Sequence, residues 1–169
     1  MQHEWLSEVD ERDEVIGPRT RGDIHRLKLR HRSVHILVFN ARGEVFLQRR
    51  SPDKDINPGL WDTSAAGHVD HGEDYDASAR RELEEELGIV AADALEPLFK
   101  LPASANTGWE FVWVYRLIHD GPLCLNAEEI SGGDWFAPAA IDAWISQSGA
   151  DLTRSFQVIW QRFLGLGSG

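Results

Sequence analysis

The sequence predicts an α/β sandwich, in which helices pack against a β-sheet. Two observations carry this prediction: strand-like segments occur on both sides of one long amphipathic helix, and two further helical segments gather at the C-terminal end. The chain has 169 residues, and its apolar content of 42% and charged content of 27% are typical of a globular protein. This length suffices to bury a core, so we expect one domain over residues 1–169.

Residues 1–30 are expected to add a hairpin and a short helix to that domain. Trp5–Val9 and Val15–Ile16 flank a charged turn, which is typical of a short hairpin. Thr20–Leu29 follows as a helix, because Thr20 is suited to cap it and an acid stands at the third helical position.

The later elements follow from alternation between β-rich runs and turn signals. Ser33–Phe39 and Val45–Gln48 are expected strands joined by a turn, and a loop rich in Pro, Asp, Asn and Gly runs from Ser51 to Gly59. The remaining expected elements are strands at Thr63–Val69, Leu95–Leu101, Glu110–Ile118 and Gly132–Phe136, the last at a sheet edge, and helices at Pro138–Ser146 and Leu152–Leu164.

The segment from Gly67 to Ile89, GHVDHGEDYDASARRELEEELGI, carries the strongest functional signal. On a helix, Glu82, Glu85 and Glu86 lie at i, i+3 and i+4, so their carboxylates share one face. Three like charges this close repel one another. A hard divalent cation such as Mg²⁺ turns the repulsion into binding, because it takes oxygen ligands and also coordinates substrate phosphates. The alternative, an acidic surface helix, does not explain the spacing of the preceding glycine and acid.

This segment resembles the signature box of the Nudix hydrolases, with its glycines, arginine and acids at the family spacing. The resemblance implies a mixed sheet between helices, an α/β/α sandwich in which residues 67–89 form a strand, a loop and a helix. It implies hydrolysis of an X-diphosphate of the nucleoside diphosphate type, by water attack at phosphorus with Mg²⁺ or Mn²⁺ as cofactor. The implied metal ligands are Glu82, Glu85, Glu86 and the carbonyl oxygen of Gly67.

The same resemblance implies roles for neighbouring residues. Arg81 is expected to orient a carboxylate, and Glu73 to lock the loop or to bind metal through water. A bound metal offsets charge on the diphosphate and can lower the pKa of a water. The identity of the general base stays open between Glu82 and a further acid outside the box, for which the candidates are Glu110, Glu128 and Glu129, unless these are solvated loop acids.

Residues upstream of the box carry a second resemblance. The runs at 31–40, 48–51 and 58–62 and the Gly67-His68 pair are similar to the Nudix branch that contains isopentenyl-diphosphate isomerase, and most similar to its isomerase-like hydrolases. Such isomerases carry an essential cysteine before the Gly-His pair, where this chain has Ala66. Alanine has no proton to transfer, so Ala66 and the intact box acids favour hydrolysis over isomerisation.

Histidines of this chain also match that branch. His31 and His68 correspond to metal-binding histidines of the isomerases, and His25 aligns less well. With the cysteine absent, these histidines could serve packing or hydrogen bonding instead. Whether they bind a second metal stays open at this point.

Basic and aromatic residues supply the candidates for substrate binding. Isomerase-like relatives place basic residues at Arg50 and Lys54, so we expect these two to bind the diphosphate unless they form a solvated turn. Trp109, with Phe111 and Trp113 around one strand, could stack a nucleobase or could pack in the core.

Charge and composition exclude several classes of protein. A net charge of −11 with no basic stretch argues against nucleic-acid binding. The acidic N-terminus lacks the apolar core of a signal peptide, and no run reaches membrane-spanning length. We therefore expect a cytoplasmic enzyme, a monomer or homodimer, whose partner is a small-molecule diphosphate. The rival hypotheses are an isopentenyl-diphosphate isomerase and a non-catalytic Nudix-fold binding module, which need not keep the carboxylates.

Overall fold

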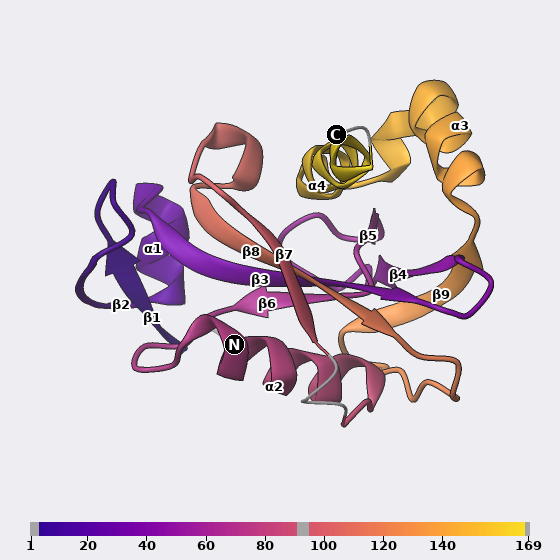
Figure 1. The fold of residues 1–169 in the computed structure, drawn as a ribbon. Helices are drawn as coiled ribbons and strands as arrows, with labels where there is room; N and C mark the ends of the chain where they lie inside the picture. The colour runs from indigo at the N-terminus through magenta and orange to yellow at the C-terminus, as the bar shows by residue number, and fades with distance from the viewer. Residues whose placement is uncertain (1–3, 91–94, 168–169) are drawn as a thin grey trace.

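The structure is a computed structural model of the chain and describes residues 4–90 and 95–167. Its centre is a seven-stranded sheet, with a two-stranded hairpin beside it (Figure 1). Strands β3 (His31–Phe39) and β8 (Glu110–Ile118) run parallel, and the other pairings recorded between strands of the large sheet are antiparallel. The sheet is therefore mixed, as predicted.

The strand order leaves an opening in the sheet. The strands run β5-β4-β3-β8-β7, with β6 also paired to β3 and β9 also paired to β4. β3 pairs with β4 only at Phe39 and Val45, whereas residues 33–36 of β3 pair with β6. β3 and β4 therefore diverge toward one end of the sheet. The further strands are β4 (Val45–Arg50), β5 (Trp61–Asp62), β6 (Ala65–His68), β7 (Glu96–Leu101) and β9 (Ile130–Phe136).

Two hydrophobic clusters lie on opposite faces of this sheet. Side chains alternate along β3, so Val34, Ile36 and Val38 pack toward one helix while Leu37 and Phe39 pack toward two others. Figure 1 shows these layers, with one helix on one face and the C-terminal helices on the other. This arrangement confirms the α/β/α sandwich. The helices are α2 (Tyr75–Leu87), α3 (Pro138–Ser148) and α4 (Arg154–Leu166).

Helix α2 is the helix of the box. Its N-cap residue Asp74 accepts a hydrogen bond from the Ala77 backbone N–H at 2.7 Å. Leu83 and Leu87 are buried in the cluster on its side of the sheet. The helix ends at Gly88, whose φ of +69° is the left-handed conformation that glycine adopts without strain.

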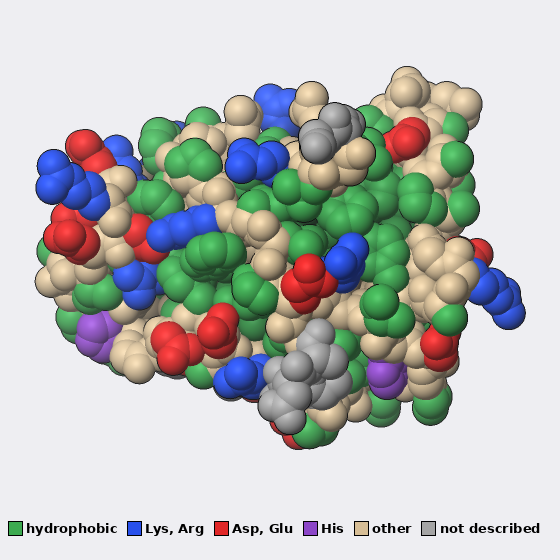
Figure 2. Space-filling model, in the orientation of Figure 1, with side chains coloured by type: hydrophobic (Ala, Val, Ile, Leu, Met, Phe, Trp, Pro, Cys, Tyr) green, Lys and Arg blue, Asp and Glu red, His purple; other side chains and the backbone are tan. Residues whose placement is uncertain are grey.

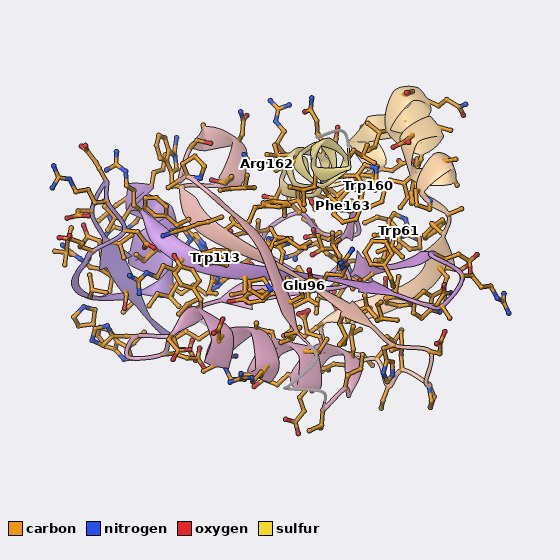
Figure 3. All side chains as sticks on the ribbon, viewed as in Figure 1. Trp61, Glu96, Trp113, Trp160, Arg162 and Phe163 are labelled. Atoms are coloured by element: carbon orange, nitrogen blue, oxygen red, sulfur yellow. The ribbon has the colours of Figure 1, made fainter. Side chains whose placement is uncertain are left out.

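Aromatic side chains join the C-terminal helices to the sheet. Trp160 of α4 stacks near Phe163, with ring centroids 5.4 Å apart, and both lie on the side of α4 that faces the sheet (Figure 3). Trp61 of β5 lies 5.3 Å from Trp144 of α3 and 5.6 Å from Phe136 of β9. These contacts close the second face of the sheet.

The N-terminal hairpin and helix form as predicted, with different bounds. β1 spans Trp5–Val9, but β2 spans Val15–Thr20, longer than expected, because its Gly-Pro step continues the pairing with β1. Helix α1 spans Arg21–Leu27; Thr20 caps it, accepting a hydrogen bond from a backbone N–H at 3.2 Å. It ends two residues early because Lys28 takes a left-handed conformation.

Further bounds also differ from expectation. The predicted strand over Thr63–Val69 is shorter, since β6 starts at Ala65 and Thr63 and Ser64 use their side chains in buried hydrogen bonds. β9 begins two residues earlier than predicted, and β4 is its one partner among the described strands, as an edge strand requires. Short 3₁₀ helices at Ala105–Thr107 and Gly149–Asp151 were not predicted.

The surface carries mixed charge. On the face seen in Figure 2, basic and acidic side chains are interspersed with apolar ones. None of the described helices combines the length and apolar character needed to cross a membrane.

Candidate active site

A pocket of about 990 Å³ opens beside the box, a size typical of small-molecule sites. It is bounded by α2, by α1, and by the loops at 53–57 and 105–109. Its lining combines acidic and basic side chains: Glu82, Glu85, Glu86, Glu110, Glu129, Arg21, Arg50, Lys54 and Arg154. The fold therefore brings together most of the residues that the sequence singled out.

The three box acids differ in their exposure to solvent. Glu86 is buried, Glu82 keeps 12% of its side-chain surface exposed, and Glu85 keeps 55%. Glu86 Oε1 accepts hydrogen bonds from the Ala66 backbone N–H at 2.9 Å and from Gln48 Nε2 at 3.0 Å. Two carboxylates are thus fixed inside the pocket, and the third stands at its rim.

Burial acts strongly on the inner pair. It raises the pKa of Glu82 well above the usual range, and the neighbouring Glu86 carboxylate raises it further. Burial also raises the pKa of Glu86, against hydrogen bonds from Ala66 and Gln48 that lower it. Two buried carboxylates that share a site are costly unless protons or a cation neutralise them. This donor set of hard oxygens fits Mg²⁺ or Mn²⁺.

Arg81 organises the acids around it. Its guanidinium donates to both carboxylate oxygens of Glu73 at 2.9 Å and to Glu82 at 2.7 Å. It also donates to the carbonyl oxygen of His68 at 3.1 Å, which ties β6 to the helix. Glu73 in turn accepts a hydrogen bond from the Asp70 backbone N–H at 3.2 Å, so it holds the loop of the box closed. Arg81 therefore orients carboxylates in this structure.

A second polar cluster lies at the other end of the pocket. Ligand atoms of His25, His31, His68 and Glu110 all lie within 4.8 Å of one another, an arrangement that could hold a metal ion. Glu110 Oε2 is 3.0 Å from His68 Nε2 and 3.3 Å from His31 Nε2. Burial, then the neighbouring histidines, lower the pKa of His25 to about 4. His25 matches the isomerase branch less well than His31 and His68 do, but the fold of α1 brings it to the cluster.

The predicted diphosphate-binding residues also reach the pocket. Arg50 donates from Nε and Nη2 to the carbonyl oxygen of Ile56, at 3.1 and 2.8 Å, and Lys54 contacts the carboxylate of Glu129. Glu129 lines the pocket, whereas Glu128 is exposed and lies outside its lining. The two neighbouring acids are thus separated by the fold.

The aromatic candidates are separated as well. Trp109 lines the pocket, and its backbone carbonyl accepts a hydrogen bond from the His31 N–H at 3.1 Å. Trp113 packs on the opposite face of the sheet, 6.5 Å from the rings of Tyr75 and Tyr115 (Figure 3). Phe111 is buried on β8. Of the three, only Trp109 lies where it can contact a ligand in this pocket.

Several pocket residues were missed in the sequence. Gln48 holds Glu86, and Arg21 forms a paired ion bridge with Asp55 at 2.7 and 2.9 Å that joins α1 to the loop carrying Lys54. Ser33 and His35 also line the pocket. Polar residues at alternate positions of an otherwise apolar strand were the signal that could have identified the last two.

Comparison with known proteins identifies the family. The profile of the NUDIX domain matches residues 29–156. A Nudix hydrolase of Pseudomonas aeruginosa is 41% identical over 136 residues, which are 80% of this chain and 79% of that protein. A Nudix hydrolase of Deinococcus radiodurans is 38% identical over 144 residues, 85% of this chain and 84% of that protein. A crystal structure of a Deinococcus radiodurans protein matches with a TM-score of 0.78 and 35% identity, covering 86% of this chain and 90% of that one.

The chain therefore belongs to the Nudix family. It is a Nudix hydrolase, an enzyme that acts on phosphoanhydride bonds in derivatives of nucleoside diphosphates.

Proposed function

We propose that this enzyme is a metal-dependent hydrolase that cleaves an X-diphosphate, with X a nucleoside-type group, by attack of water at phosphorus. The observation that carries the proposal is the pair at the wall of the pocket formed by the buried Glu86 and the largely buried Glu82. Arg81 offsets part of the charge of Glu82, the remaining charge of the pair is costly without a further cation, and the exposed Glu85 completes the acidic face.

The box residues would hold Mg²⁺ or Mn²⁺ through Glu82, Glu85, Glu86 and the Gly67 carbonyl oxygen. A cation bound there supplies charge neutralisation for the diphosphate and makes water a better nucleophile at neutral pH. Arg81 keeps Glu82 oriented, and Gln48 and the Ala66 N–H keep Glu86 oriented.

Two further groups complete the proposed reaction. Arg50 and Lys54 bind phosphate oxygens, the arginine through a planar fork and the lysine as a point charge. Glu129 takes the proton of the attacking water. Of the candidates outside the box, Glu128 does not line the pocket and Glu110 belongs to the histidine cluster, whereas Glu129 lines the pocket next to Lys54. Trp109 at the far wall stacks against X.

The histidine cluster is proposed as a second cation site in the same pocket. His31 supports it: its Nδ1 is 2.8 Å from the Leu29 carbonyl oxygen, and its Nε2 is buried without a hydrogen bond, 3.3 Å from Glu110 Oε2. A cation held by the cluster would give Nε2 a partner. Metal analysis of the purified protein and of His31→Gln tests the assignment, since the variant should lose metal while Glu86→Gln retains it at this cluster.

Two rival functions are disfavoured by specific residues. An isomerase of prenyl diphosphates needs a proton donor where this chain has Ala66, and the methyl group has none. A binding module has no need for buried carboxylates in a costly charged pair.

A screen of phosphate-bond cleavage tests the proposal. Nucleoside di- and triphosphates, sugar nucleotides, dinucleotides and prenyl diphosphates are incubated with the enzyme in Mg²⁺, in Mn²⁺ and in EDTA. Cleavage of at least one nucleoside diphosphate derivative in metal and none in EDTA is the expected result. Cleavage that EDTA leaves unchanged, or no cleavage of any compound, would overturn it.

A further inference from the structure

Strand β3 carries an unusual row of polar side chains on its pocket side. His31, Ser33 and His35 share one face of the strand, and the next two residues on that face are the core residues Leu37 and Phe39. Ser33 and His35 lie between the histidine cluster and the box, because Ser33 is paired with His68 and His35 with Ala66 on β6. Ser33 and His35 therefore form the floor of the pocket between the two charged clusters, whereas His31 is not part of its lining.

Ser33 has a hydroxyl group without a partner. Only 2% of the residue is exposed, and its Oγ has no hydrogen bond among the described residues. A buried hydroxyl that stays unpaired costs about 1–3 kcal/mol, so such groups in native proteins usually meet a ligand or a water. Because Ser33 lines the pocket, a ligand in the pocket is the nearest candidate partner for this hydroxyl.

The hydrogen bonds around His35 favour the tautomer of its neutral ring that carries the proton on Nδ1. Nδ1 lies 2.8 Å from Thr63 Oγ1, and Thr63 Oγ1 has its own acceptor in the Ala65 carbonyl oxygen at 3.3 Å. The single hydroxyl proton of Thr63 goes to that carbonyl, so Nδ1–H donates to Thr63. Asp62 Oδ1, 3.9 Å from Nδ1, favours the same arrangement. Nε2 is then a bare acceptor, and no described group is bonded to it.

The chemistry of Ser33 Oγ and His35 Nε2 determines which ligand groups can bind against the floor of the pocket. A bare Nε2 repels a phosphate oxygen and attracts an O–H or N–H donor. The side chain paired with His35 across the strands is only the methyl group of Ala66, which leaves space beside the ring. A prenyl chain has no donor for Nε2, whereas a ribose has two hydroxyl groups.

We propose that Ser33 and His35 are the specificity-determining residues of this pocket and that they bind the ribose hydroxyls of X. This inference rests on the proposed function for the position of the diphosphate. It adds that the enzyme selects ribonucleoside groups over dideoxyribonucleoside and prenyl groups by hydrogen bonds from the floor.

Two minimal variants test this inference. Ser33→Ala deletes only the unpartnered hydroxyl, so the melting temperature without ligand should not fall. His35→Asn retains a donor close to the position of Nδ1, for Thr63, and deletes Nε2. The matched control is His119→Asn, because His119 also has a buried Nε2 without a partner but lies outside the pocket lining.

The readout is the preference for ribose. Binding of ADP, CDP, GDP and UDP, of their 2′,3′-dideoxy analogues and of dimethylallyl diphosphate is measured by calorimetry in Ca²⁺, and turnover of the same compounds in Mg²⁺. We expect the wild-type protein and His119→Asn to bind at least one ribonucleotide about tenfold more tightly than its dideoxy analogue. Each pocket variant should lower that preference several-fold, and the double variant should nearly abolish it.

The proposed hydrolysis and the proposed ribose binding can fail separately. Binding preference that falls in the variants, without turnover of any compound, overturns the proposed hydrolysis but supports the role of Ser33 and His35. Turnover together with equal binding of ribose and dideoxy compounds by the wild-type protein overturns this inference alone. An undiminished preference in both pocket variants overturns it too.

Discussion

The carboxyl group of Glu82 lies directly against the Cα atom of Gly67. A Cβ atom at position 67 would sit 2.1 Å from Glu82 Cδ, far inside contact distance. The glycine of the box is therefore required by close packing against a carboxylate, in addition to the metal-binding carbonyl that the family resemblance implies. β6 and α2 meet at this contact, which sets the position of the proposed metal ligands.

Replacing Gly67 by alanine should displace the Glu82 carboxylate. The clash is with the end of a flexible side chain, so the fold should persist while Mg²⁺ binding and turnover are lost. The stabilising shift in melting temperature on addition of millimolar Mg²⁺ measures the binding, because a ligand of the folded state stabilises it by mass action. Gly165→Ala is the control, since a Cβ there meets nothing within 4 Å. Equal Mg²⁺ shifts in the two variants would refute the displacement.

The raised pKa values of Glu82 and Glu86 predict a pH-dependent stability without metal. Their folded-state pKa values lie above the ordinary glutamate value of 4.5, so the unfolded state releases protons first as the pH rises. At a pH between 4.5 and the raised folded-state pKa values, the folded state binds more protons than the unfolded state. The free energy of unfolding in EDTA should therefore fall with increasing pH. Thermal melts at about pH 5 and pH 8 should show this decrease, and Glu82→Gln should reduce it. In Mg²⁺ the decrease should shrink, because the cation replaces the protons. A steeper loss in Glu82→Gln than in the wild-type enzyme would contradict the assignment.

Arg50 and Lys54 are predicted to bind the diphosphate. Arg50→Ala should raise KM by about 10-fold to 100-fold, the range of a charge-assisted hydrogen bond, and Lys54→Ala by less. Arg50→Lys should not restore affinity, because an ammonium group cannot form the paired bonds of a guanidinium. Steady-state kinetics on the best substrate measures both effects. Arg49→Ala is the matched control, since Arg49 is exposed and outside the pocket lining. Unchanged kinetics in both pocket variants would favour the alternative, in which Arg50 and Lys54 only form a solvated turn and do not bind substrate.

The alanine at position 66 predicts the absence of isomerase activity. Isopentenyl and dimethylallyl diphosphates should not interconvert with the purified enzyme, because the methyl group of Ala66 transfers no proton. Ala66→Cys should not restore much isomerisation, since proton transfer also needs an acid on the opposite face and a dry pocket. Product analysis by chromatography decides the question. Robust interconversion by the unmodified protein, with no cleavage of any diphosphate, would establish the rival function.

The acidic face of the box helix was predictable from the sequence because it depends only on helical geometry. The helical period alone puts Glu82, Glu85 and Glu86 on one face, and the helix of the box forms where its pattern predicts it. The different burial of the three acids was not predictable in the same way. It depends on β6 and Gln48, which approach α2 from other parts of the chain.

The start of β8 explains what the sequence left open. Trp109 and Trp113 looked equivalent around one strand, but β8 begins at Glu110, and Trp109 lies before it with a φ of +64°. Trp109 is therefore outside the regular strand, whereas Trp113 lies within it on the face that α2 covers. His25 joins His31, His68 and Glu110 only because α1, β3, β6 and β8 converge at one end of the sheet. Contacts between segments that are far apart in the chain leave no pattern in the local sequence.

The most direct test of the account is the rate at which Glu86→Gln cleaves the best nucleoside diphosphate derivative in Mg²⁺. Glutamine keeps the size of the side chain and an oxygen for the Ala66 N–H, so folding should be retained while a metal-binding carboxylate is lost. Glu84→Gln is the matched control on the same helix, because Glu84 is exposed outside the pocket lining. We predict a loss of at least about 100-fold in kcat for Glu86→Gln and wild-type rates for Glu84→Gln. A folded Glu86→Gln enzyme that works at the wild-type rate would contradict metal-dependent hydrolysis at this site.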